Sequence, residues 1–167
     1  MKIGSPLSED TDIGPIISKV SIRQIDAFIT ESKDHGAKLI RGGKIIGNCY
    51  TPTILEADCD NNIANYKEVF GPVVTLSKVK NIYQAITCCN KSPFGLHTAI
   101  FTNNINNAHK AINELDCSGV MVNDSSDYRI DSMPFGGVRS SGMGREGVKS
   151  AIEAMSETKV VCFKLKI

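Results

Sequence analysis

The chain has 167 residues, a length that fits one compact domain and hardly two. Hydrophobic residues make up 41% of it, charged residues 22%, and the formal net charge is +1, so the composition is that of an ordinary globular protein and argues against a nucleic-acid or anionic-membrane partner. No apolar stretch reaches the roughly 18 residues that span a bilayer, and the N-terminus lacks the apolar core of a signal peptide, so we expect a cytoplasmic protein.

The first part of the chain predicts one helix and two short strands. Apolar residues recur at helical spacing after Pro15, which suits the first turn of a helix, and Gly36 is a plausible stop. Lys38–Ile40 and Thr51–Leu55 are strand candidates on either side of a glycine-rich loop. The apolar stripe that we expect on the helix consists of Ile16, Ile17, Val20, Ile25, Phe28 and Ile29.

Strands and helices alternate in the middle of the chain. The predicted segments are, in order, Val73–Val79 (strand), Ile82–Cys89 (helix), His97–Thr102 (strand), Ile105–Leu115 (helix) and Gly119–Val122 (strand). A β-α-β-α-β order with short connections predicts an α/β fold with a mostly parallel sheet flanked by helices. Ligands of such sheets gather at the carboxyl ends of the strands, so residues 123–137 are the first place to look for a site.

The end of the chain predicts one more helix, Arg145–Met155, and a final strand, Thr158–Leu165. Gly142–Gly147 matches the pattern G-x-G-x-x-G in front of that helix. It follows a Pro- and Gly-containing loop, however, and Cys162 stands about 20 residues on, where a dinucleotide fingerprint requires an acidic residue. We interpret these glycines as permitting tight turns and a close-packed helix start.

The six cysteines form no Cys-x-x-Cys pair, so the sequence gives little support for a metal site. Three of them lie within apolar helix or strand patterns, and we interpret all six as reduced, buried thiols. Cys88 and Cys89 stand late in an amphipathic helix with only Lys91 as a nearby cation, which favours packing over nucleophilic chemistry. None of the three histidines shows a triad spacing with a cysteine or serine.

Several motifs, in the same order, resemble those of the aldehyde dehydrogenase superfamily. Lys67-Glu68-Val69-Phe70-Gly71-Pro72 closely resembles its Glu-x-Phe-Gly-Pro signature. Its later signature segments are similar to Phe94-Gly95-Leu96, Ile100-Phe101-Thr102, Val122-Asn123, Pro134-Phe135-Gly136-Gly137 and Ser141-Gly142-Met143-Gly144-Arg145-Glu146. The resemblance runs through essentially the whole chain and identifies it as a C-terminal fragment of such an enzyme.

The resemblance implies NAD(P)-dependent oxidation of an aldehyde to its acid through a Cys-bound thiohemiacetal. The nucleophilic cysteine, the general-base glutamate and the Rossmann-like cofactor domain of the family all lie upstream of the matched region. The resemblance therefore implies no catalytic residue in this chain, no activity of the chain alone, and at most weak binding of NAD or NADP. Glu68 matches the glutamate that accepts hydrogen bonds from the nicotinamide ribose, and Phe70 matches the aromatic residue beside the nicotinamide ring.

The substrate end of the resemblance lies in residues 123–137. Phe135 matches an aromatic wall of the substrate tunnel, and Ser125, Ser126 and Arg129 are suited to binding a hydroxyl, carboxylate or phosphate. The polar loop looks most like the lactaldehyde, succinate-semialdehyde and non-phosphorylating glyceraldehyde-3-phosphate branches, so we expect a small polar or anionic aldehyde. The alternative is that Arg129 simply pairs with Asp127 or Asp131 on the surface.

The family also has an oligomerisation strand, which the C-terminal strand resembles. We therefore expect residues 1–155 to be part of a catalytic domain and residues 156–167 to be an oligomerisation strand whose unpaired edge supports a homo-oligomer, a dimer or tetramer. Two other functions stay open: a non-enzymatic truncated or assembly module, and a part of a CoA-acylating aldehyde dehydrogenase.

Overall fold

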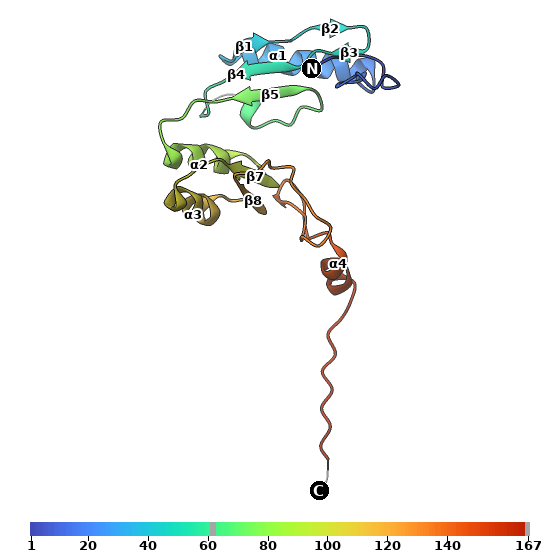
Figure 1. The fold of residues 1–167 in the computed structure, drawn as a ribbon, viewed down its shortest axis with the longest axis vertical. Coiled ribbons are helices and arrows are strands. Elements are labelled where there is room, and N and C mark those ends of the chain that lie inside the picture. Colours follow the sequence, from blue (N-terminus) through green and yellow to red (C-terminus); the bar gives the residue numbers. More distant parts are fainter. Residues whose placement is uncertain (61–62, 166–167) are drawn as a thin grey trace. The chain divides into compact units, whose positions relative to one another are not determined.

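Helices and strands alternate along the chain in the computed structural model, which describes residues 1–60 and 63–165 (Figure 1). The chain divides into two compact units, residues 1–92 and 93–167. The first contains α1 (Lys19–Asp34), β1 (Lys38–Arg41), β2 (Ile45–Ile46), β3 (Cys49–Tyr50), β4 (Thr53–Glu56), the 3-10 helix η1 (Ile63–Asn65), β5 (Val73–Leu76) and α2 (Ile82–Lys91). The second contains β6 (Phe94–Gly95), β7 (His97–Ile100), α3 (Ile105–Glu114), β8 (Gly119–Val122), β9 (Val138–Arg139) and α4 (Val148–Ala154).

Helix α1 begins at Lys19 and not at Pro15, because Ser18 caps it. The Ser18 hydroxyl accepts a hydrogen bond from the Ser21 amide at 3.0 Å, which satisfies one of the first backbone donors of the helix. The helix ends at Asp34, close to the predicted stop. The Ser18 cap therefore places the start of the helix at Lys19, after the predicted Pro15, whereas the helix ends near Gly36 as predicted.

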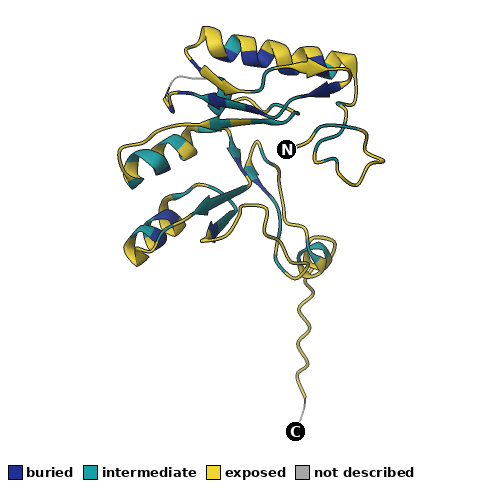
Figure 2. Cartoon of the chain, turned by 45° about the horizontal axis from the view of Figure 1, so that its top comes forward, coloured by how far each residue is buried: buried dark blue, intermediate teal, exposed yellow. Residues whose placement is uncertain are grey.

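The core of the first unit forms where α1 covers one face of the strands. Buried positions lie on one side of α1 and exposed positions on the other (Figure 2). Ile17 is 95% exposed and Val20 54% exposed, so the apolar stripe is narrower than the sequence predicts. The core consists of Ile22, Ile25, Phe28, Ile29, Tyr50 and Leu55.

A three-stranded sheet in the order β1-β4-β5 underlies α1. Strand β1 runs antiparallel to β4, and β5 runs parallel to it. Thr53 and Leu55 of β4 are buried while the residues between and after them are half-buried, as the period of two of a strand requires. The predicted glycine-rich loop contains a small antiparallel hairpin of β2 and β3.

The second unit is built on a parallel pair, β7 and β8, with His97 opposite Gly119. Helix α3 lies between them in sequence and buries Ala108 and Ala111. The side chain of Asn104 caps α3 by accepting hydrogen bonds from two backbone amides. A second pair, β6 and β9, is antiparallel.

The predicted α/β class is confirmed, whereas the mostly parallel sheet is not formed. The described residues form one three-stranded sheet and three two-stranded ones, with parallel pairing only in β4–β5 and β7–β8. The predicted alternation correctly gave the order of β5, α2, β7, α3 and β8. It does not determine which strands pair, because pairing depends on contacts that are distant in sequence.

The end of the chain departs from its predicted structure. Helix α4 begins at Val148 and not at Arg145, because Gly147 has a φ of 112° and makes no side-chain cap. The expected strand over Thr158–Leu165 is absent: residues 156–165 run as exposed, extended chain after α4 (Figure 1). A strand requires a hydrogen-bonding partner, and within the described chain these residues have no paired strand.

The cysteines correct the expectation that all six are reduced and buried. Cys59 and Cys88 form a disulfide, and Cys89 and Cys162 are exposed. Of the others, Cys49 is buried and Cys117 is half-buried. A separation of 29 residues between the bonded pair carries no sequence signature that would have predicted it. In the described part of the chain, every helix is too short or too polar to cross a bilayer.

Candidate functional site

The segment that carries Glu68 and Phe70 is an exposed loop between η1 and β5. Glu68 is exposed and Phe70 is 82% exposed, whereas Val69 between them packs against the core of the unit. A carboxylate and a large aromatic ring thus stand on the outer side of the loop. An apolar ring left so exposed is not part of the core, and a ligand or another protein segment is suited to cover it.

The loop is held against α1 by a close approach of its backbone. A Cβ atom at Gly71 would stand 2.5 Å from Cδ1 of Ile25, a core residue of α1, so only glycine allows this approach. On the other side of Glu68, Lys67 Nζ lies 3.3 Å from Glu31 Oε2, also on α1. The two contacts, at Lys67 and at Gly71, lie on either side of Glu68 and Phe70.

A hollow of about 580 Å³ lies between the loop and α1. Glu68 and Phe70 line it together with Gln24 and Glu31 of the helix. An ionised carboxylate accepts hydrogen bonds with both oxygens, and an aromatic face packs against a flat ring. The hollow is therefore suited to a ligand that carries neighbouring hydroxyl groups beside a planar ring, and the structure brings together the two residues that the sequence assigns to the cofactor.

The second candidate region lies in the other unit, around Phe135. The guanidinium carbon of Arg129 lies 4.1 Å from the centroid of the Phe135 ring, a cation–π contact. The imidazole of His97 meets the same ring edge-on, with centroids 5.1 Å apart and the planes at 84°. Phe135 thus contacts Arg129 of its own loop and His97 of β7, a strand distant in the sequence.

Glu146 completes this arrangement. Phe135 and Glu146 form an isolated antiparallel bridge, in which the Phe135 amide donates to the Glu146 carbonyl at 3.1 Å. The bridge brings the Glu146 side chain to Arg129, and Oε2 lies 3.2 Å from Nη2. The prediction that a surface pairing of Arg129 would involve Asp127 or Asp131 is therefore wrong, because a backbone bridge delivers a different carboxylate.

Ser125 and Ser126 lie in the same exposed loop, and their main-chain atoms make the following contacts. Nδ1 of His97 lies 3.0 Å from the Ser126 carbonyl oxygen, and the Ser125 amide donates to Asp124 Oδ1 at 2.8 Å. The structure thus brings Ser126, Arg129 and Phe135 together through His97. Sequence reasoning missed His97 and Glu146 as parts of the site. His97 belongs to none of the matched motifs, and Glu146 ends one of them, but the motif gives no sign that its side chain reaches Arg129.

Space for the His97 ring comes from the neighbouring strand. A Cβ at Gly119, which pairs with His97 in the β7–β8 register, would stand 2.5 Å from Cδ2 of the imidazole. The absence of a side chain at Gly119 therefore lets His97 reach over to Phe135 and the Ser126 carbonyl. The paired strands β7 and β8 therefore position the loop that contains Ser126 and Phe135 through the side chain of His97.

A family model described as the aldehyde dehydrogenase family matches residues 1–161. A lactaldehyde dehydrogenase of Methanococcus maripaludis is 44% identical over 159 residues, which are 95% of this chain and 34% of that protein. The crystal structure of the glyceraldehyde-3-phosphate dehydrogenase GapN of Methanocaldococcus jannaschii, complexed with NADP, matches with a TM-score of 0.88 at 45% identity, covering 94% of this chain and 34% of that one.

A plant structure is equally similar in fold. Aldehyde dehydrogenase 21 of Physcomitrella patens, in complex with the reaction product succinate, matches with a TM-score of 0.89 at 40% identity and covers 96% of this chain and 34% of that one. The chain thus spans about a third of the length of the relatives it matches. A family match over nearly its whole length, supported by these relatives, shows that the chain belongs to the aldehyde dehydrogenase family.

Proposed function

We propose that this chain is the C-terminal third of an NAD(P)-dependent aldehyde dehydrogenase that oxidises a small polar or anionic aldehyde to its carboxylic acid. The observation that carries the proposal is the contact of Arg129 with Phe135, a cation held on an aromatic wall in the loop that resembles the substrate end of the family. The relatives that act on lactaldehyde or hold succinate support a short polar substrate.

Glu68 and Phe70 fit the nicotinamide end of NAD or NADP. The Glu68 carboxylate would accept hydrogen bonds from the ribose hydroxyls, and the Phe70 ring, which lines the same hollow, would pack beside the nicotinamide. The approach of Gly71 to Ile25 and the ion pair of Lys67 orient the segment that carries them. When bound, the dinucleotide supplies the acceptor for the hydride of the aldehyde.

Arg129, Phe135 and the Ser125–Ser126 turn fit the far end of the aldehyde. The guanidinium offsets the charge of a carboxylate or phosphate, and the Phe135 ring limits where the carbon chain can lie. Glu146 holds Arg129 in the absence of an anion, so an anionic substrate competes with this carboxylate or joins it at the guanidinium. The nucleophilic cysteine, which forms the thiohemiacetal, and the general base belong to polypeptide that precedes this region in the enzyme, so the chain alone is inactive.

Residues 1–155 form part of the catalytic domain in this proposal, and residues 156–167 form the oligomerisation strand of a dimer or tetramer. Exposed apolar side chains support an oligomerisation role for residues 156–167. In the single chain, water covers the side chains of Val160, Val161, Phe163 and Leu165. Pairing with a second copy would bury them and satisfy the backbone. In the whole enzyme, the parallel pairs β4–β5 and β7–β8 would belong to a larger, mostly parallel sheet.

The test is a substrate panel assayed with the enzyme that contains this chain. We expect higher kcat/KM for lactaldehyde, succinate semialdehyde or glyceraldehyde 3-phosphate than for hexanal, with either NAD or NADP. Equal or better oxidation of hexanal would contradict the proposed substrate class. Product formation that requires coenzyme A would assign the chain to the CoA-acylating branch instead.

A further inference from the structure

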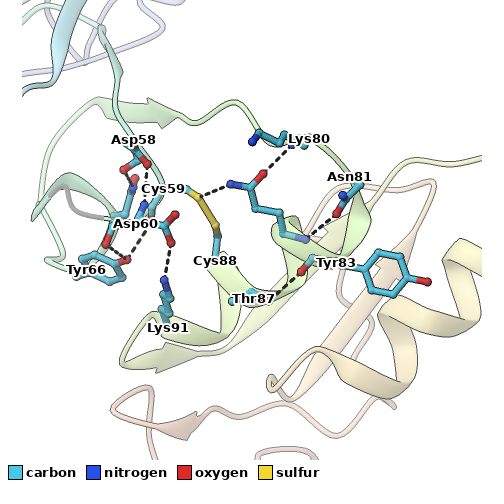
Figure 3. Close-up of a disulfide and its surroundings, with 12 residues drawn as sticks. Asp58, Cys59, Asp60, Tyr66, Lys80, Asn81, Tyr83, Thr87, Cys88 and Lys91 are labelled. Atoms are coloured by element: carbon cyan, nitrogen blue, oxygen red, sulfur yellow. Dashed lines mark hydrogen bonds and ion pairs between the residues drawn. A yellow bond between two sulfur atoms is a disulfide. The ribbon is translucent and has the colours of Figure 1, made fainter.

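The disulfide of the first unit joins the two ends of the segment that carries Glu68. Cys59 follows β4, and Cys88 lies in the last turns of α2, with the two Cα atoms 5.8 Å apart (Figure 3). That separation lies within the range in which a disulfide forms without backbone movement. The bond therefore closes a loop that contains Glu68, Phe70 and strand β5.

The two sulfur atoms differ in their surroundings. Cys59 is 4% exposed, its sulfur faces the amide of Gln84 at 3.9 Å, and its carbonyl accepts a hydrogen bond from the Tyr66 hydroxyl at 2.8 Å (Figure 3). Cys88 is half-buried. Lys91, on the same helix as Cys88, forms an ion pair with Asp60. The Cys59 side is thus fixed by several contacts, and Cys88 is the more accessible partner.

A hollow of about 370 Å³ reaches both cysteines. Its lining combines the small apolar residues Ala64 and Ala85 with the polar residues Asn65, Thr75 and Ser77. The bond is therefore open to the hollow and is not enclosed in the core. A small molecule can approach the bond from there, and the exposure of the two cysteines directs it to Cys88.

We propose that Cys59–Cys88 is a reversible thiol–disulfide exchange site that takes a low-molecular-weight thiol, and that its state controls the order of the segment carrying Glu68 and Phe70. The thiolate of the small thiol attacks Cys88 Sγ, the Cys59–Cys88 bond breaks, and Cys59 leaves as a thiolate that takes up a proton. A second small thiol then attacks the mixed disulfide, which releases Cys88 as a thiol and the small molecule as its own disulfide. Two thiols are oxidised and one protein disulfide is reduced, and the reverse reaction with the small disulfide restores the bond.

The consequence follows from the position of the bond. When it is closed, the bond ties the segment after β4 to the C-terminal turns of α2, which removes conformations chiefly from the locally unfolded states of the enclosed segment. When it opens, the Lys91–Asp60 ion pair still joins these two elements, but both groups are partly exposed, so it holds them weakly. The link to the cofactor rests on the proposed function of Glu68 and Phe70.

The experiment is a redox titration of the full chain with reduced and oxidised glutathione, in the presence of a chelator that keeps metal ions off the two thiols and Asp60. After each equilibration the sample is alkylated and the cysteine peptides are measured by mass spectrometry. We expect Cys59 and Cys88 to change state together, with a transient glutathione adduct on Cys88 and none on Cys59. Failure of the bond to form at any ratio, or its reduction only after denaturant is added, would overturn the exchange site.

Variants sharpen this result. Cys162→Ser, which removes an exposed thiol outside both the bond and the hollow, is the control and should leave the titration unchanged. Cys59→Ser should trap the glutathione adduct on Cys88, and the wild-type titration decides the question even where this variant fails to fold. Hydrogen exchange of residues 67–70 should be several-fold faster in the reduced chain. Unchanged exchange there would overturn the control of the segment, and none of these readouts requires cofactor binding or activity.

Discussion

Arg129 lies on the face of Phe135 with its guanidinium carbon 4.1 Å from the ring centroid, while Glu146 accepts a hydrogen bond from its Nη2. This contact joins a charge to an aromatic wall in a loop that is otherwise exposed. The cation–π contact and the ion pair together restrain the guanidinium more than either contact alone would. The contact therefore presents a fixed positive charge where a substrate anion can meet it.

In the enzyme that contains this chain, Arg129→Ala should raise the KM for anionic aldehydes and should leave kcat and the KM for uncharged aldehydes nearly unchanged. A hydrogen bond to a charged group contributes about 1.5–3 kcal/mol, which corresponds to roughly 10- to 100-fold in KM. Arg129→Lys keeps the charge without the planar fork, so its KM for anionic aldehydes should lie between those of the wild type and Arg129→Ala. The control is Arg23→Ala, on the exposed side of α1. Steady-state kinetics with succinate semialdehyde and propanal measure the difference. An equal loss for both substrates would mean that Arg129 acts only on folding or loop structure.

Gly119→Ala should displace the His97 ring and loosen residues 125–135. The added Cβ would stand 2.5 Å from the imidazole, and overpacking of this kind costs about 1–3 kcal/mol. Limited proteolysis should then cut the loop faster, and the unfolding midpoint in urea should fall. Gly14→Ala, where the new Cβ meets its nearest neighbour at 3.8 Å, should change neither measurement. His97→Phe keeps a ring but loses the contact with the Ser126 carbonyl oxygen, so it should loosen the loop with a smaller loss of stability than Gly119→Ala. If the loop of His97→Phe resists proteolysis as well as that of the wild type, the positioning role of His97 is refuted.

Much of this architecture follows from the sequence, and the exceptions have identifiable causes. The order from β5 to β8 follows from hydrophobic periodicity, and the exposure of Glu68 and Phe70 follows from their place on a turn before a strand. The pairing of Arg129 with Glu146 depends on a backbone bridge between residues distant in sequence, and the Cys59–Cys88 bond depends on how α2 lies against the end of β4. Periodicity reports which face of an element is buried, and it carries no information on such distant contacts.

The pH dependence of stability should carry a contribution from Tyr50. Burial, followed by a 2.9 Å hydrogen bond from its hydroxyl to Asp26, raises the pKa of the Tyr50 phenol above its ordinary value. A group whose pKa is raised by folding stabilises the native state fully below its unfolded pKa, about 10 for tyrosine, and this contribution is lost as the pH rises through the folded pKa. The free energy of unfolding should therefore decrease as the pH rises above roughly 10.

Tyr50→Phe isolates that contribution. It should lower the free energy of unfolding by about 1 kcal/mol near neutral pH and flatten its decrease at alkaline pH, because the titrating group is gone. Urea unfolding across this pH range is the measurement, with Tyr83→Phe, at an exposed position of α2, as the control. A Tyr50→Phe profile that falls as steeply as the wild type at alkaline pH would assign the dependence to other groups.

Removal of residues 156–167 should abolish oligomer formation. Exposed apolar side chains on an extended segment without a paired strand are suited to strand pairing with a second copy. Light scattering should give a dimer or larger species for the whole chain and a monomer for the truncated one. A whole chain that stays monomeric at high concentration would refute the oligomerisation strand.

Whether these residues lack the reactive nucleophile is measured by the rate of NAD(P)H formation from lactaldehyde. The rate is compared between the chain alone and a chimera in which the chain replaces the matching segment of the Methanococcus maripaludis lactaldehyde dehydrogenase. We expect no aldehyde oxidation by the chain alone and cofactor-dependent oxidation by the chimera, whose other part supplies the nucleophilic cysteine and general base. Oxidation of lactaldehyde by the chain alone would refute the proposed function, because it would place the reactive nucleophile within these residues.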